Sequence, residues 1–154
     1  MSALTHRSYV HRQFSNPALV SLIFCIVFAA ILTWWIPLRG LLGVGILMAV
    51  LVVVAAVHFA FVSLTIEVGE GELRWHFGPG VWRKRLPLNS IANVKRDRLP
   101  WWYGVGVKYT PGAWAYLVAP GPAVRIATAD GCIIRLGTDD PEGLMNALAG
   151  PRVA

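Results

Sequence analysis

Hydrophobic positions follow two patterns along the chain, continuous in the first third and alternating afterwards. Residues 18–36 and residues 41–64 contain no charged side chain, and each run is long enough to cross a bilayer as an α-helix. Residues 37–40 alone separate the two runs, so the helices must run antiparallel. The pattern therefore predicts a transmembrane hairpin of two spans over residues 18–64.

Beyond the second run, hydrophobic residues recur at every second position, which is typical of β-strands with one buried face. Strands are predicted at residues 64–68, 73–77, 82–86, 91–96, 105–109, 114–118, 124–126 and 132–136. Asp130-Gly131 predicts a type I′ hairpin turn before the last strand. A helix with an aspartate cap is predicted from Pro141 to the glycine-proline pair at 150–151. We expect about seven antiparallel strands closed by a C-terminal helix, an α+β or all-β domain over residues 65–150.

Charge assigns an orientation to the hairpin. The chain has 154 residues, 56% hydrophobic and 14% charged, which disfavours an ordinary soluble protein. Basic residues lie in the N-terminal segment 1–17 and again at 74–85, against the single Arg39 between the spans. By the positive-inside rule, both the N-terminal segment and the C-terminal tail 151–154 are cytoplasmic. We therefore expect a multi-pass protein of the cell (inner, cytoplasmic) membrane.

Small residues form one line along each predicted span, as they do where helices approach closely in a bilayer. The residues of the two lines are Ser21, Cys25, Ala29, Thr33, Gly45, Ala49, Ala56 and Ala60. Two interpretations stay open, packing within the hairpin and homo-oligomerisation. His58 is the one ionisable residue in the spans, and it is either an interfacial histidine or a functional group.

Residues 81–108 hold seven basic side chains against Asp97 alone. In a domain joined directly to a membrane, such side chains can contact anionic headgroups. We assign this contact to Arg83, Lys84 and Arg85. The other interpretation is a solvated basic face that reinforces the topology.

Residues 100–104, Pro-Trp-Trp-Tyr-Gly, are the most unusual run of the C-terminal part. Large aromatic side chains suit either a small core or an interface with a membrane or a protein. On the second interpretation, Arg96, Arg98 and Trp101 border a surface offered to a protein partner.

The sequence lacks the motifs of several functional classes. Its four histidines have no metal-ligand spacing, and no nucleophile elbow or phosphate-binding loop occurs, so we expect no metal, no cofactor and no catalytic residue. Cys25 and Cys132 lie in unrelated segments and form no disulfide framework. Basic residues interleaved with aromatics suit nucleic acid, but no groove-reading helix or RNA-binding motif accompanies them, so we expect no nucleic-acid partner.

The aromatic run continues as WWYGVGVKYTPG over residues 101–112, and LGTDDPE follows at 136–142. Together with the strand order and the closing helix, these motifs resemble the bacterial pleckstrin-homology-like (PH) domain family, in its form with two N-terminal transmembrane helices. The resemblance implies a strongly bent sandwich or partly open barrel, closed at one end by the helix. Relatives that bind phosphoinositides use basic residues around the first strand turn. Here that turn, residues 69–72, is acidic, so a pocket of that type is not expected.

These observations lead to one expected function and one alternative. We expect a membrane-tethered, non-enzymatic interaction or scaffold module, whose PH-like domain binds a protein partner or a second copy and touches anionic lipid. The alternative is a small transport or channel accessory subunit whose hairpin oligomerises. Deleting residues 65–154 separates them, because only a transport role can survive in the hairpin alone.

Overall fold

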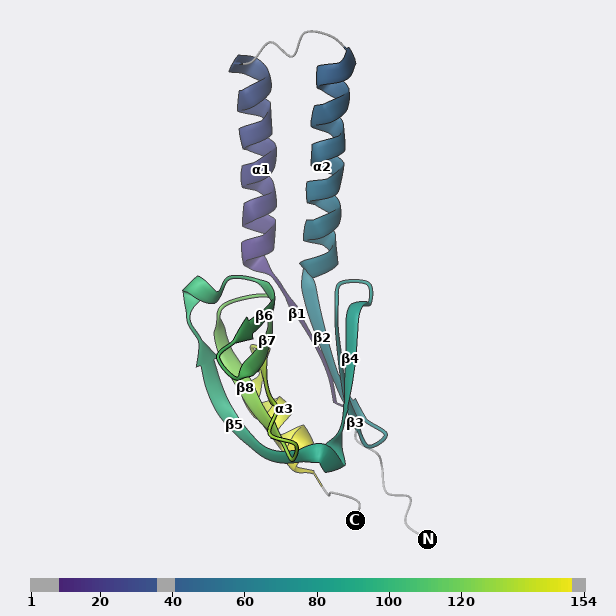
Figure 1. Cartoon of the computed structure of the whole chain (residues 1–154), viewed down its shortest axis with the longest axis vertical. Helices are drawn as coiled ribbons and strands as arrows, with labels where there is room; N and C mark the ends of the chain where they lie inside the picture. The colour runs from purple at the N-terminus through teal and green to yellow at the C-terminus, as the bar shows by residue number, and fades with distance from the viewer. Residues whose placement is uncertain (1–8, 36–40, 151–154) are drawn as a thin grey trace.

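The computed structural model describes residues 9–35 and 41–150. Two helices stand side by side on a β-rich domain (Figure 1). They are α1 (Asn16–Trp35) and α2 (Leu41–Phe61), which agree with the predicted runs to within three residues. The second helix ends earlier than predicted, because residues 63 and 64 already belong to a strand.

One of the two helices, over Gly43–Phe61, is long and apolar enough to cross a membrane. The apolar stretch described in α1, Leu19–Ile31, is shorter. Large apolar side chains are exposed along both helices, among them Phe24 at 69% and Val52 at 64%. Such exposure of continuous apolar surface indicates contact with something other than water.

Within the described residues the domain contains nine strands, more than the seven or so expected, with two short 3₁₀ turns and one helix. The strands are β1 (Tyr9–Phe14), β2 (Ser63–Gly69), β3 (Glu72–Phe77), β4 (Val81–Pro87), β5 (Ile91–Leu99), β6 (Gly106–Thr110), β7 (Ala113–Leu117), β8 (Gly121–Thr128) and β9 (Ile133–Gly137). The turns are η1 (Leu88–Ser90) and η2 (Trp101–Tyr103), and the helix is α3 (Pro141–Ala149). All the predicted strands and the closing helix are present, and the class is α+β.

The strands form two sheets, in the orders β1-β2-β3-β4 and β5-β8-β9-β7-β6. We call them sheet A and sheet B. The expectation of purely antiparallel strands is wrong at one pair, because β7 and β9 run parallel. After the β8–β9 hairpin, β9 occupies the position between β8 and β7, and its direction is then fixed by β8. Alternation within a strand carries no information about this choice of neighbour.

β1 was not predicted from the sequence. It pairs antiparallel with β2, from Tyr9 opposite Val68 to Phe14 opposite Ser63. Its half-buried and exposed residues alternate, but its apolar residues do not, since the half-buried side includes His11 and Gln13. The N-terminal segment therefore contributes an edge strand to a sheet whose other strands follow the hairpin.

The turns also differ from expectation. The Asp130-Gly131 turn has a four-residue loop instead of a type I′ pair, and Asp130 does not take a positive φ. Its carboxylate instead accepts a hydrogen bond from Thr128 Oγ1, which also lowers the Asp130 pKa. A two-residue turn with positive φ at both positions does occur at Glu70 (53°) and Gly71 (77°), between β2 and β3.

The main core lies between the two sheets and α3. It includes the inward residues of β2 and β3, with Trp75 against Tyr116 at a ring-centroid distance of 5.3 Å. α3 contributes Leu144 and Leu148 and contacts β5, β8 and β1. Its N-cap is Asp140, whose carboxylate accepts a hydrogen bond from the Gly143 backbone N–H at 2.9 Å. The helix thereby joins the edge of sheet A to sheet B.

Candidate interaction surface next to the helices

The domain is joined to the helices by two chain connections and a packing contact. β1 continues into α1 through Ser15, whose backbone N–H donates to the Val62 carbonyl oxygen at 2.7 Å. α2 continues into β2, and Phe61 packs against Phe77 with ring centroids 5.2 Å apart. Gly78, with φ of 46°, lies so close to α2 that a Cβ would come within 2.7 Å of a backbone oxygen of that helix. These contacts fix the domain in one orientation below the helix ends.

The start of β4 lies beside the end of α2 (Figure 1), and it carries an exposed aromatic side chain. Trp82 is 52% exposed, and its φ of 55° is strained for a bulky side chain. The register between β3 and β4 shifts between Trp75 and Phe77, so Trp82 lies in a β-bulge. A bulge at an edge strand also discourages pairing with a further strand.

Arg83 lies in this bulge and Lys84 and Arg85 follow it on β4, and all three are exposed. Within the described residues none of them pairs with a carboxylate, and Arg83 Nε donates to the Gly80 carbonyl oxygen at 3.1 Å. Arg74 beside them differs: carboxylates at 2.8 and 3.0 Å accept hydrogen bonds from it, which raises its pKa. The positive charge of β4 is therefore available to an external anion.

These side chains surround a hollow of about 490 Å³ at the β3–β4 edge of sheet A. It is lined by Glu67, Arg74, Trp75, His76, Arg83, Lys84 and Arg85. The basic side chains of its lining outnumber the single carboxylate, which is that of Glu67. The hollow has room for a phosphate-sized group.

The η2 turn separates its three aromatic residues. Tyr103 packs on a small second core of Leu99, Ala115, Leu117 and Ala123, on the outer side of sheet B. Trp101 and Trp102 project outward and are 78% and 67% exposed. Sequence reasoning left core packing and a binding surface open for this run. The structure assigns packing to Tyr103 and exposure to the two tryptophans.

Arg96 and Arg98 lie two residues apart on β5, the edge strand of sheet B. Arg96 Nη1 donates to Glu142 Oε1 of α3 at 3.2 Å, and both side chains remain mostly exposed. Trp101 follows just beyond the end of β5. The proposed partner residues are thus on sheet B, whereas Arg83, Lys84 and Arg85 are on sheet A.

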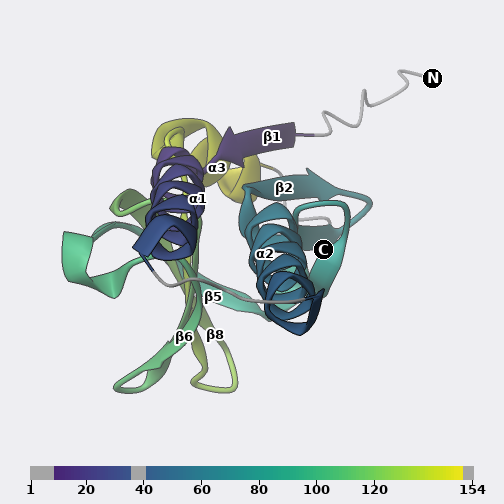
Figure 2. The ribbon, with the colours of Figure 1, turned by 90° about the horizontal axis from the view of Figure 1, so that it is seen from above.

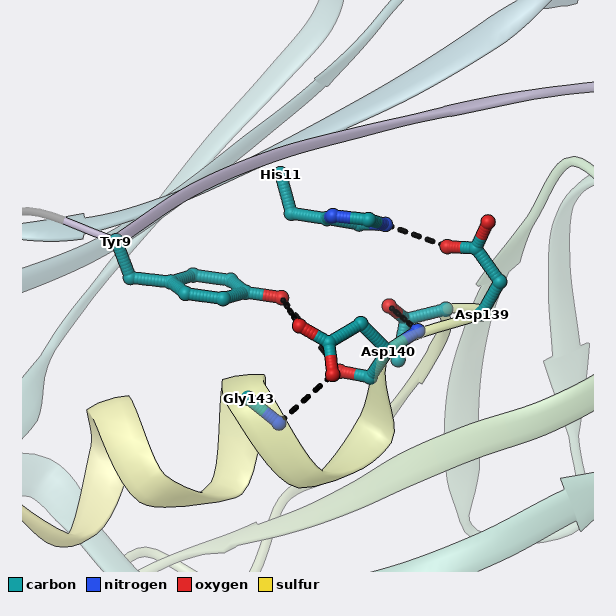
Figure 3. A network of polar contacts seen from close by, with 6 residues as sticks. Tyr9, His11, Asp139, Asp140 and Gly143 are labelled. Atoms are coloured by element: carbon teal, nitrogen blue, oxygen red, sulfur yellow. Dashed lines mark hydrogen bonds and ion pairs between the residues drawn. The ribbon is translucent and has the colours of Figure 1, made fainter.

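A polar network links β1 to the start of α3 (Figure 3). The Tyr9 hydroxyl donates to Asp140 Oδ2 at 3.2 Å, and His11 Nε2 is paired with Asp139 Oδ1. Burial and the neighbouring Asp140 carboxylate raise the Tyr9 pKa above its ordinary range. The sequence left the helix cap open between Asp139 and Asp140, and the structure assigns it to Asp140. The sequence indicated no role for Tyr9 and His11, because nothing local to residues 9–11 points to a partner.

Within the hairpin, Ser21 Oγ and His58 Nε2 are 2.6 Å apart, and His58 Nδ1 lies 2.8 Å from the Val54 carbonyl oxygen. Among the predicted small residues, Cys25, Ala29 and Ala60 are half-buried, whereas Gly45, Ala49 and Ala56 are exposed. The side chain of Thr33 lies outside the described part. His58 thus joins the two helices near the domain.

The described residues contain no group of three His, Cys, Asp or Glu side chains that could hold a metal ion. Cys25 and Cys132 are both free thiols. Comparisons with protein-family models, with curated proteins and with solved structures give no match. The site must therefore be interpreted from its own geometry.

Proposed function

We propose that the protein is a two-span protein of the cytoplasmic membrane that holds a PH-like domain at the cytoplasmic surface, as a non-enzymatic module for a protein partner or a second copy. The β1–β2 ladder carries this proposal. It extends directly from α1 and α2, so the domain has no flexible linker on either side. Because the domain is fixed in this way, every copy of the protein presents the same surface at the same distance from the membrane.

Two observations support the two-span arrangement. α1 has 20 residues, and at 1.5 Å per residue that length covers a hydrocarbon core of about 30 Å. β1 leads into α1, β2 follows α2, and the two strands pair in one sheet. Both ends of the hairpin therefore emerge on the same side of the membrane. The basic residues of the domain support a cytoplasmic location for that side, by the positive-inside rule.

The binding surfaces follow from exposure and charge. Arg83, Lys84 and Arg85 meet anionic headgroups, each contributing about 1 kcal/mol when near the surface. Arg96, Arg98 and Trp101 border the surface for the partner, on the other sheet. A partner that covers Arg96 also meets Glu142, because the two side chains are paired.

Cysteine labelling tests the arrangement in a bacterial host. Single-cysteine chains with Val10→Cys, Arg39→Cys or the native Cys132 are treated with a membrane-impermeant maleimide in spheroplasts. Only the Arg39→Cys chain should react before permeabilisation, and the other two only afterwards. Reaction of Val10→Cys or Cys132 in intact spheroplasts contradicts the proposal.

Photo-crosslinking tests the partner surface in the full chain. A photoreactive residue at Arg98 should give a discrete adduct, either at twice the chain mass or with one other protein. The same residue at Arg74, exposed on sheet A, is the matched control. No adduct at Arg98, or the same adducts at both positions, refutes the assignment.

A further inference from the structure

Two turns of the domain that carry exposed aromatic side chains flank the helices, and we call them the two aromatic points. From the side, the β3–β4 turn and the η2 turn after β5 reach the same level, just below the ends of α2 and α1 (Figure 1). Seen from above, they lie on opposite sides of the helix pair (Figure 2). The contact of Gly78 with α2 fixes the height of the first turn. The domain thus reaches the plane of the helix ends at two separated places.

Each point combines an exposed tryptophan with a basic side chain. The first has Val81, Trp82 and Arg83, and the second has Trp101 and Trp102 with the Lys108 ammonium beside Gly104. Tryptophan favours the boundary between hydrocarbon and water, where its ring is apolar and its N–H finds a partner. Lysine and arginine favour the same region, where their charges meet headgroup phosphates.

Packing within the domain does not account for these tryptophans. Tyr103 packs on the second core, whereas Trp101 and Trp102 are mostly exposed and form a ring pair with centroids 6.0 Å apart. Trp82 keeps a strained φ although its side chain is half exposed. Strained positions of this kind cluster at functional sites.

We infer that Trp82 and the Trp101–Trp102 pair insert into the interfacial region of the bilayer that holds the hairpin, so that the domain is attached at two points besides its helices. The inference rests on the proposed insertion of the hairpin. It moves Trp101 from the partner surface to the lipid surface. Attachment at two points on opposite sides of the helix pair restricts tilting of the domain, and it leaves Arg96 and Arg98 exposed on β5 beside the second point.

Depth-dependent quenching tests the inference on the full chain in liposomes. In a Cys25→Ala, Cys132→Ser background, a fluorophore is placed at Val81→Cys or Trp102→Cys. Asn89→Cys in η1, at the opposite end of the domain, is the matched control, and Val52→Cys in α2 reports insertion itself. Nitroxides on the lipid headgroup or deep in the acyl chain serve as quenchers.

Headgroup nitroxides should quench positions 81 and 102 about twofold or more above position 89, and deep nitroxides should quench position 52 best. The effect at 102 should persist in neutral phosphatidylcholine, because the remaining ring of Trp101, and not a charge, holds this turn at the interface. Quenching at 52 without excess quenching at 81 and 102 overturns the inference and leaves the proposed function standing, with a protein partner for the tryptophans. No quenching at 52 overturns the proposed membrane insertion instead.

The substitution Trp82→Gly distinguishes a role of Trp82 in membrane contact from a role in the stability of the fold. Glycine relieves the positive φ, so the thermal midpoint of the domain should stay the same or rise. Headgroup quenching at position 81 should nevertheless fall, because the inserted ring is gone. A lowered midpoint with unchanged quenching would assign Trp82 a structural role and refute its part in the inference.

Discussion

Tyr9 links the first strand of the chain to its last helix. Its hydroxyl donates to Asp140, which also caps α3 through the Gly143 N–H. His11 from the same strand pairs with Asp139, so two neighbouring carboxylates each bind one side chain of β1. The start of α3 and the edge of sheet A are therefore coupled through single residues.

Because of this link, the free energy of unfolding should fall at alkaline pH. The Tyr9 pKa in the folded chain is raised above the ordinary value near 10, by burial first and then by the charges of Asp140 and Asp139. Its contribution is complete below about pH 10 and is lost as pH rises toward the folded pKa, because the unfolded tyrosine ionises first. Burial also raises the Tyr116 pKa, which adds a slope of the same sign.

We predict that Tyr9→Phe lowers the free energy of unfolding by about 1 kcal/mol at neutral pH, because one hydrogen bond is lost. The variant should also lose less stability than the wild type between pH 9 and 11. Denaturant unfolding of the full chain in detergent measures both effects. A slope equal to that of the wild type would show that Tyr9 does not titrate with folding.

Among the elements, β1 is short but makes a large contribution to how the molecule is held together. It adds a strand to sheet A, contacts α3 and continues into α1, so it fastens the domain to the first helix. β4, at the opposite edge of the same sheet, bears the bulge and the three successive basic residues. One edge of sheet A therefore serves attachment, and the other is protected by charge.

We predict that replacing residues 9–13 by a glycine-serine repeat speeds amide exchange in β2 and α3 by about tenfold or more, because both lose a packed neighbour. The control is Val10→Ser with Phe14→Ser, which changes only side chains that are 62% and 55% exposed. Exchange measured by mass spectrometry in detergent should distinguish the two. Equal protection in both variants would show that β1 is not needed for the sheet.

For the whole molecule, orientation is set where the β3–β4 turn meets α2. Gly78 and Gly71 both have positive φ, at 46° and 77°, but only Gly78 lies against another element. An alanine at either position pays about 1–2 kcal/mol for the left-handed conformation. At Gly78 it must also push the turn away from the helix.

Gly78→Ala should therefore lower the free energy of unfolding by about 3 kcal/mol, against about 1 kcal/mol for the matched Gly71→Ala. Thermal or denaturant unfolding of the full chain gives the difference. Gly78→Ala should also reduce headgroup quenching at position 81, since the turn moves from the helix end. Equal losses at the two glycines would mean that the domain is not packed against α2.

Local patterns in the sequence determined the positions of most elements. Two uncharged runs predicted the helices, alternation predicted the strands from β2 to β9, and an aspartate at 139 or 140 before Pro141 predicted the start of α3. Each of these signals lies within a few residues of the element it predicts, because helix capping and side-chain alternation are short-range effects. The local sequence also indicated that the segment of β4 is basic and exposed.

Tertiary structure decided which of these elements meet. The pairing of β1 with β2, the parallel contact of β7 with β9 and the binding of Tyr9 to Asp140 join residues distant in sequence. The exposure of Trp101 and Trp102 beside packed Tyr103 likewise depends on which face of sheet B the η2 turn covers. Such choices follow from the edges and surfaces left uncovered once the other elements have packed, and no local window of sequence contains that information.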